Sequence, residues 1–260
     1  MIALITPTGS RLEQFKLCAM FMQRQTYKEK VTWIIIDDAY PVTTDHVGEG
    51  FKDDWTIIKI YPTPIWTGSN TQSRNIAAGI DALLANYKED QIEAVFMIED
   101  DDYYRANYLQ RMMDRFGKYK VIGEMNTVYY NVFYRNYFAN RNTSHVSLFQ
   151  LAFKPEMIPL FKTCYEERFI DFKFFEKLHA QLYVNRNEVL LFNENNLAIG
   201  IKGMPGRKGI GAGHGNTMNM LPDSQMIYLT SQIQEDAKLY EGYYGDRSVA
   251  QHPLFAQRRI

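Results

Sequence analysis

The sequence predicts an α/β protein built around a mostly parallel central sheet with helices on both faces. Residues 31–36 and 94–98 are apolar throughout, as strands are when a parallel sheet is covered on both sides. Segments with apolar residues at helical spacing alternate with such strands over the first 116 residues. This alternation is typical of a sheet layered between helices.

The first half of the chain divides into short elements that end at turn-forming residues. Residues 2–6 are apolar and stop at Pro7-Thr8-Gly9, which predicts a buried strand entering a loop. Ser10 and Glu13 have the spacing of a capping box for the helix that follows. The later expected elements are strands at 31–36 and 56–60, a helix from about 71 to 87, a strand at 94–98 and a helix from about 106 to 116.

The second half is less regular. Tyr, Phe and Asn with partial alternation fill residues 121–138, and a strand is expected at 146–153. A helical stretch over 156–182, broken near Phe169, and short strands at 189–192 and 197–201 follow. Neither an internal repeat nor a clean linker is visible, which favours a single domain.

Composition excludes several classes of protein. With 29 Lys plus Arg against 30 Asp plus Glu, the net charge of −1 argues against a globally basic nucleic-acid coat. Two distant cysteines, Cys18 and Cys164, make no disulfide framework and favour a reducing compartment. No apolar stretch reaches the length of a membrane span, so we expect a cytoplasmic protein.

Two predicted strands end in carboxylates: one in Asp37-Asp38, the other in four acids from Glu99 to Asp102. Ligands of open α/β sheets bind at the carboxyl ends of the strands. Crowded acids repel one another, and a bound cation removes that cost. Oxygen ligands favour Mg²⁺ or Mn²⁺, which usually accompany a phosphorylated substrate. The alternative is a solvated loop or a helix N-terminus, where Asp and Glu are common.

An ordered set of motifs over roughly residues 1–116 resembles the GT-A glycosyltransferases of family 2. The family pattern has a Pro-Thr turn, a helix ending in Gln-Thr-Tyr, a strand ending in Asp-Asp, a helix opening with Ala-Arg-Asn and a strand ending in Asp-X-Asp-Asp. These motifs are matched by Ile5-Thr6-Pro7-Thr8, Gln25-Thr26-Tyr27, Ile34-Ile35-Ile36-Asp37-Asp38, Ser73-Arg74-Asn75 and Ile98-Glu99-Asp100-Asp101-Asp102. The resemblance implies one GT-A-like, Rossmann-like domain over 1–260, with a nucleotide-sugar half at 1–118 and an acceptor half at 119–260.

The resemblance also implies roles at the first two strand ends. Thr6, Pro7 and Thr8 would line the nucleoside pocket, and Asp37 or Asp38 would accept hydrogen bonds from a uracil-type base. The family's Asp-Asp-Gly-Ser is Asp37-Asp38-Ala39-Tyr40 here. Because a loop without glycine approaches the base differently, the nucleotide stays open.

Further donor-binding roles are implied around the four acids. Arg74 would lie near the base or the diphosphate, and Asp101 would bind the metal that bridges the diphosphate. Glu99 replaces the family's first Asp and would reach the ribose or a metal-bound water, and Asp100 belongs to the same donor-binding loop.

An inverting transfer needs a carboxylate that takes the proton of the acceptor hydroxyl. The family supplies it at the start of a helix beyond the metal motif, and the best match is Asp171, among aromatic residues that would raise its pKa. A helix N-cap is the structural alternative for Asp171. Glu166 and Glu167 are reserve candidates.

A basic, glycine-rich loop covers residues 202–215. Lys202, Arg207 and Lys208 among glycines suit a flap that approaches phosphate, whereas the spacing does not fit a dinucleotide fingerprint or a P-loop. By the resemblance, His214 would complete the metal shell. The alternatives are a plain surface loop and an exposed histidine.

Together with the resemblance, these observations predict a metal-dependent glycosyltransferase with a hydroxyl acceptor; the UDP-linked donor and the inversion are what the resemblance implies. The acceptor stays open among a glycan, a small molecule and a modified base in DNA; Tyr and Asn between 126 and 140 would stack on or hydrogen-bond any of them. A nucleotidyltransferase and a non-catalytic carbohydrate- or nucleic-acid-binding module are the alternative functions. The oligomeric state is left open.

Overall fold

The computed structural model describes residues 1–39, 47, 51–63, 71–180, 186–194, 196–207 and 219–245. The strands are β1 (Ile2–Thr8), β2 (Val31–Asp37), β3 (Trp55–Ile60), β4 (Ala94–Met97), β5 (Tyr103–Tyr104), β6 (Val121–Glu124), β7 (Asn126–Asn131), β8 (Asn136–Arg141), β9 (Leu151–Phe153), β10 (Val189–Phe192), β11 (Ala198–Lys202) and β12 (Leu221–Pro222). The helices are α1 (Leu12–Gln23), α2 (Thr71–Asn86), α3 (Tyr108–Phe116), α4 (Ile158–Lys162), α5 (Ile170–Ala180) and α6 (Ile227–Ile233), and a 3₁₀ helix covers Gln234–Tyr243.

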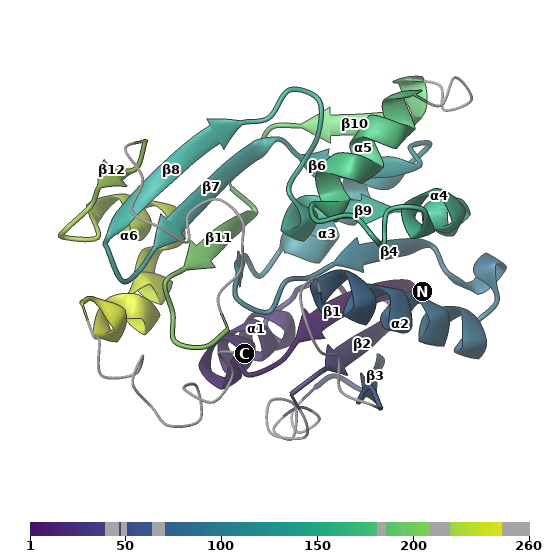
Figure 1. Cartoon of the computed structure of the whole chain (residues 1–260), viewed down its shortest axis with the longest axis horizontal. Helices are drawn as coiled ribbons and strands as arrows, with labels where there is room; N and C mark the ends of the chain where they lie inside the picture. The colour runs from purple at the N-terminus through teal and green to yellow at the C-terminus, as the bar shows by residue number, and fades with distance from the viewer. Residues whose placement is uncertain are drawn as a thin grey trace.

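A seven-stranded sheet forms the centre, in the order β10-β6-β9-β4-β1-β2-β3 (Figure 1). Strands β4, β1, β2 and β3 pair in parallel, and β10 pairs in parallel with β6. Strand β9 is antiparallel to both of its neighbours, β4 and β6. The sheet is therefore mixed, which corrects the expectation of a mostly parallel one. An apolar strand of three residues carries no sequence signal for its direction.

A second sheet of five strands, in the order β12-β8-β7-β11-β5, was not anticipated from the sequence. Strands β7 and β8 form an antiparallel hairpin in the aromatic segment, and β11 lies parallel to β7. The other edge of β11 pairs with β5 through Ala198 and Tyr104. Strand β5 has only two residues, so its sequence could not have predicted a link between the halves of the chain.

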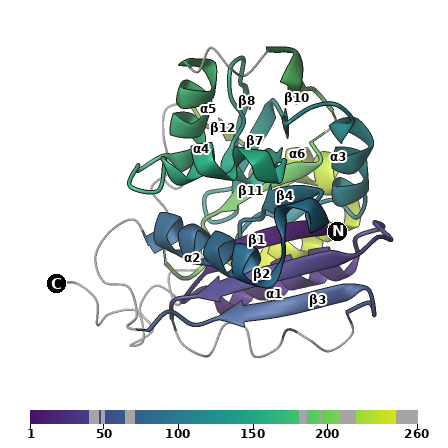
Figure 2. The same cartoon turned by 90° about the vertical axis from the view of Figure 1, so that its right-hand side faces the viewer.

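Helices cover both faces of the larger sheet because its strands alternate their side chains between two apolar clusters. Ile2 and Leu4 of β1 pack in one cluster with Phe15 of α1, whereas Ile5 packs in the other with Ile76 of α2. Figure 2 shows α2, α4 and α5 on one side of this sheet and α3 on the other. Within the described residues, no helix is both long and apolar enough to span a bilayer.

The start of α1 differs from the expected capping box. The N-cap residue is Arg11 and makes no side-chain cap hydrogen bond, while Ser10 adopts a left-handed φ of 56°. The side chain of Arg11 turns away from the helix toward the acids that follow β4. A long-range ion pair has taken the place of the local capping that the sequence suggested.

Candidate active site

The carboxyl ends of β1, β2 and β4 lie side by side. Thr8 at the end of β1 pairs with Asp37 at the end of β2, and Ile5 pairs with Met97 of β4. The segments that leave these strands, including the acid loop (residues 99–102), therefore emerge at one edge of the sheet. The strand ends that the sequence singled out meet in space.

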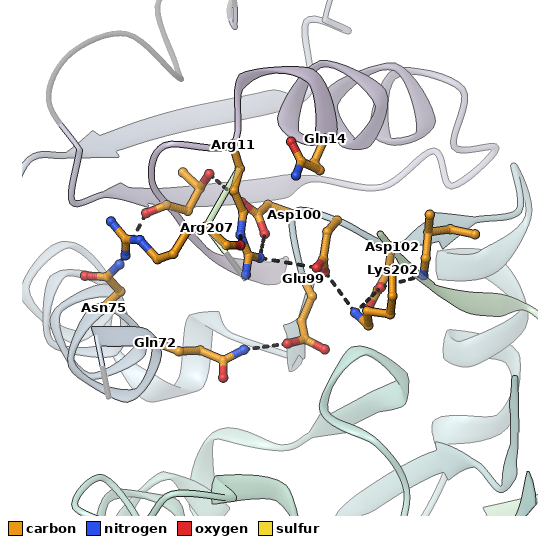
Figure 3. Close-up of polar contacts among 12 residues, drawn as sticks. Arg11, Gln14, Gln72, Asn75, Glu99, Asp100, Asp102, Lys202 and Arg207 are labelled. Carbon is orange, nitrogen blue, oxygen red and sulfur yellow. Dashed lines mark hydrogen bonds and ion pairs between the residues drawn. The ribbon is translucent and has the colours of Figure 1, made fainter. Parts of the chain in front are cut away.

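Asp100 is held from two directions. It is 1% exposed, the Thr8 hydroxyl donates to its Oδ2 at 2.6 Å, and Nη1 of Arg11 donates to its Oδ1 at 2.7 Å (Figure 3). The same Nη1 lies 3.3 Å from Oδ2 of Asp101. Arg11 is thus a shared partner of two neighbouring carboxylates.

Lys202, the last residue of β11, binds the other end of the acid loop. Its Nζ lies 3.2 Å from Oδ1 of Asp101 and 2.9 Å from Oδ1 of Asp102. The backbone N–H of Ile201 also donates to Asp102 Oδ1 at 2.9 Å. The pairing of β11 with β5, which directly follows the acid loop, brings this lysine to the acids.

Burial and ion pairing have opposite effects on the pKa values of these acids and cations. Burial raises the pKa of Asp100 and of Asp102, and the cations oppose that rise. For Arg11 and Lys202, burial favours the neutral form, but the surrounding acids outweigh it and raise the pKa of both. The repulsion between acids crowded at this strand end is therefore offset by two cations of the chain itself.

A divalent cation does not fit the acid loop in this arrangement. The described part of the chain contains no group of three or more His, Cys, Asp or Glu side chains placed to hold a metal ion. Asp101, expected as the metal ligand, lies between Arg11 and Lys202, so a metal would have to displace these two cations. His214, the other expected ligand, lies outside the described residues, as does Lys208.

Glu99 points away from its three neighbours. Its Oε1 accepts a hydrogen bond from the Gln72 side chain at 2.5 Å (Figure 3). Burial is the main reason that the pKa of Glu99 is raised, to about 7, and the nearby charge of Asp171 adds to the rise while Lys202 opposes it. Asp171 thus lies close enough to the acid loop to act on it electrostatically.

Asp171 lies in the first turn of α5 and is half-buried. Burial raises the pKa of its carboxyl, against hydrogen bonds from backbone N–H groups that include those of Phe172 and Leu148 and against the charge of His145. Helix α5 begins one residue earlier, at Ile170, so Asp171 lies inside the first turn and is not the N-cap residue that the structural alternative expected.

Asp38 is buried and forms a two-pronged ion pair with Arg207. The distances are 2.8 Å from Nη1 to Oδ2 and 2.7 Å from Nη2 to Oδ1. Gly9 borders this pair with φ +154°, and a Cβ there would lie 1.8 Å from Asp38 Oδ1, so no other residue fits. Arg207 also donates to the Thr71 hydroxyl at 2.9 Å.

The segment that carries Arg207 is fastened to the start of α1. Arg11 Nε donates to the Arg207 carbonyl at 2.8 Å, and Gln14 donates to the Pro205 carbonyl at 2.5 Å. The described part of the expected basic flap therefore lies directly over the loop after β1.

The other candidate residues have mainly structural contacts. The Thr6 hydroxyl accepts a hydrogen bond from Trp33 Nε1 at 2.9 Å, and Pro7 is buried in β1. Asp37 accepts from the backbone N–H of Ala39 at 3.0 Å. Arg74 is exposed on α2.

Sequence reasoning missed Arg11 and Gln72 and gave Lys202 only a place in a basic loop. Arg11 stands three residues after Thr8 of the Pro-Thr turn, and this position next to a strand-end loop was the only available signal. The role of Lys202 depends on strand pairing across 100 positions, which no local pattern reveals.

No protein-family model and no curated protein matches the sequence. Solved structures of S. aureus TarS do resemble the fold. TarS 1–349 in complex with UDP has a TM-score of 0.54 at 15% identity over 77% of this chain and 60% of that one. TarS 1–349 in complex with UDP-GlcNAc has a TM-score of 0.51 at 14% identity over 83% of this chain and 61% of that one.

A longer TarS chain matches with a TM-score of 0.51 at 13% identity, over 77% of this chain and 36% of that one. The present chain thus spans about 60% of the TarS 1–349 chains and 36% of the longer chain. At these identities the likeness is one of fold. The chain has the GT-A-like fold of the TarS structures.

Proposed function

We propose that this chain is a glycosyltransferase that takes a UDP-linked sugar and transfers it, with inversion, to a hydroxyl acceptor. The observation that carries the proposal is the set of charged side chains at the carboxyl ends of β1, β2 and β4 in a GT-A-like fold. A TarS structure with the same fold is a complex with UDP-GlcNAc.

The donor half comprises residues 1–118 in this proposal, with Lys202 and Arg207 reaching back from the acceptor half at 119–260. Thr6, Pro7 and Thr8 line the nucleoside pocket, and Asp37 faces the base. Asp38 acts through Arg207, which its two carboxylate oxygens hold in place. Arg74, exposed near the start of α2, meets the donor from the solvent side.

Asp171 is the proposed general base. The acceptor oxygen bonds to the anomeric carbon while the bond from that carbon to the diphosphate oxygen breaks, and its electron pair leaves with UDP. The acceptor's proton passes to the Asp171 carboxylate. A pKa raised by burial suits this role, because proton transfer is most efficient when the pKa of the base approaches the working pH. No step of the proposal uses a metal ion.

The acceptor is proposed to bind between Asp171 and the second sheet. Tyr129 of β7 is half-buried, its hydroxyl lies 2.9 Å from the Ser147 hydroxyl, and the charges of Glu99 and Asp171 both act on it. An aromatic ring beside a carboxylate base suits a sugar or a flat polar ring as acceptor.

The test is a panel of nucleotide sugars in a thermal-shift assay, followed by measurement of nucleotide release. We expect UDP-sugars to raise the melting temperature and UDP to be released from the sugar, slowly into water and faster with a suitable acceptor. Release of pyrophosphate would instead indicate a nucleotidyltransferase. Binding of a sugar without release of any nucleotide would indicate a binding module.

The Asp171→Asn variant tests the base. UDP release is expected to fall by about 10²- to 10⁴-fold with donor binding unchanged. Glu176→Gln, on the same helix and exposed in a pair with Lys173, is the matched control and keeps its turnover. Unchanged turnover in Asp171→Asn would dismiss Asp171 as the base.

A further inference from the structure

We infer that the donor's diphosphate is held by cations of this chain, with Arg11 as the residue that meets it, and not by a metal ion on the acid loop. The inference rests on the proposed function and adds Arg11 and Lys202 to its site. It follows from how the acids and cations at the strand ends are partnered.

Each aspartate of the acid loop already has a cation from the chain. Arg11 contacts Asp100 and Asp101, and Lys202 contacts Asp101 and Asp102, all at 3.3 Å or less. Metal ligands must turn their oxygen atoms toward one point, whereas these oxygens are turned toward two separate cations. A divalent ion here would place its charge next to the Lys202 ammonium and the Arg11 guanidinium.

The two cations differ in exposure, and so in what they can reach. The side chain of Lys202 is 6% exposed, and its ammonium group is enclosed by Asp101 and Asp102. The side chain of Arg11 is 16% exposed, and its Nη2 has no hydrogen-bond partner among the described residues. Lys202 therefore fixes the acids, while Arg11 keeps N–H donors for a ligand.

Arg207 lies beside Arg11 and is 32% exposed in its side chain. The hydrogen bond from Arg11 Nε to the Arg207 carbonyl joins the loop after β1 to the segment after β11. Two guanidinium groups held this way offer the planar, directional donors that suit phosphate oxygens. They would stabilise the charge that develops on the diphosphate as the bond to the sugar breaks.

The acids have a positioning role in this arrangement. Asp100 binds Thr8 on one oxygen and Arg11 on the other, which fixes the guanidinium at the end of β1. Asp38 does the same for Arg207. Strand-end carboxylates that would bind a metal in other settings here orient arginines.

The experiment measures binding of UDP and UDP-GlcNAc by calorimetry, in excess EDTA and again with Mn²⁺. In wild type we expect the two dissociation constants to agree within about threefold. Arg11→Gln is expected to weaken binding by about 10- to 100-fold, the loss typical of charge-assisted hydrogen bonds. Arg11→Lys keeps the charge without the planar donors, so its dissociation constant should lie between those of wild type and Arg11→Gln.

Arg24→Gln is the matched control, because Arg24 ends the same helix segment in an exposed pair with Asp236. Its binding should equal that of wild type, and circular dichroism should show every variant folded. A second readout is a titration with Mn²⁺ alone, in which wild type and Asp101→Asn are expected to behave alike.

The outcomes separate this inference from the proposed function. Binding that appears only with Mn²⁺ overturns the inference and leaves the glycosyltransferase proposal standing. Unchanged binding in a folded Arg11→Gln variant also overturns it. If neither UDP nor UDP-GlcNAc binds under any condition, the proposed function itself fails. The comparison of EDTA with Mn²⁺ uses wild type, so it decides the matter even if Arg11→Gln does not fold.

Discussion

Two buried groups of polar side chains offset the cost of burying a carboxylate in different ways. In the acid loop, Asp100, Asp101 and Asp102 are paired with cations. Glu124, at the end of β6, is fully buried and is held by neutral donors instead. The backbone N–H of Leu197 reaches its Oε2 at 2.8 Å and the Gln150 amide at 3.4 Å.

The two groups differ in what opposes the rise of the carboxyl pKa on burial. Around Glu124, burial raises the carboxyl pKa to about 7, because neutral hydrogen bonds only partly replace water. Its Oε1 has no hydrogen-bond partner among the described residues. Around the acid loop, burial also raises the pKa of Asp100 and of Asp102, but there the nearby cations oppose the rise. Equal burial is thus countered by cations of the chain at one site and by neutral donors at the other.

The largest effect is expected from Lys202→Met, which removes the cation of Asp101 and Asp102. Breaking a buried ion pair leaves uncompensated charge, so we expect a loss of about 3–5 kcal/mol in the free energy of unfolding, measured with urea at neutral pH. Lys16→Met is the control, since Lys16 pairs with Glu13 on the surface and should cost less than about 0.5 kcal/mol. Similar losses in the two variants would remove the contrast between buried and exposed pairs.

The pH dependence of stability in Glu124→Gln tests how the neutral donors hold the Glu124 carboxyl. The unfolded state ionises near the ordinary pKa of 4.5, whereas the folded state keeps the proton until about 7. Wild-type stability therefore falls as pH rises between these values, by up to about 3 kcal/mol, and the fall is complete above the folded pKa. Glutamine does not ionise. The free energy of unfolding of the variant, measured with urea, should therefore rise relative to that of wild type between about pH 5 and about pH 8. A difference independent of pH would contradict the raised pKa.

The smallest effect is expected from the same substitution, Thr to Val, made once beside the acid loop and once in the group around Glu124. Thr8→Val removes a hydrogen bond to the Asp100 carboxylate. Thr127→Val removes hydrogen bonds with neutral groups, among them one to the Gln150 amide at 2.7 Å and one from the Asn142 amide at 3.0 Å. We expect costs of about 2 and about 1 kcal/mol. The cost of Thr8→Val should shrink at acid pH as Asp100 takes up a proton, and that of Thr127→Val should stay constant. Parallel pH profiles would mean that the charge of Asp100 does not matter.

The sequence predicted the site's position because that depends on local patterns. Apolar strands that run into acids at Asp37 and Glu99 indicated which strand ends to inspect, and parallel pairing brings those ends together. The GT-A-like fold followed from the same motifs and is confirmed by the likeness to TarS.

The partners of those acids depend on tertiary structure and escaped prediction. Arg11 looked like part of a helix start, yet its side chain leaves the helix for Asp100. Lys202 looked like one cation of a flexible basic loop, yet it ends a buried strand. A metal was expected at Asp101 because only charges of one sign are visible in the local sequence.

The separation between Lys202 and the acid loop has a consequence for how the chain folds. Lys202 reaches Asp102 across 100 positions, and the two-residue strand β5 must pair with β11 before the contact can form. Contacts between residues so distant in sequence close slowly, because the intervening chain loses entropy first. Until β11 docks, the collapsing first half carries adjacent buried acids without this counter-ion. We therefore expect the edge of the sheet that is proposed to bind the donor to be completed late in folding.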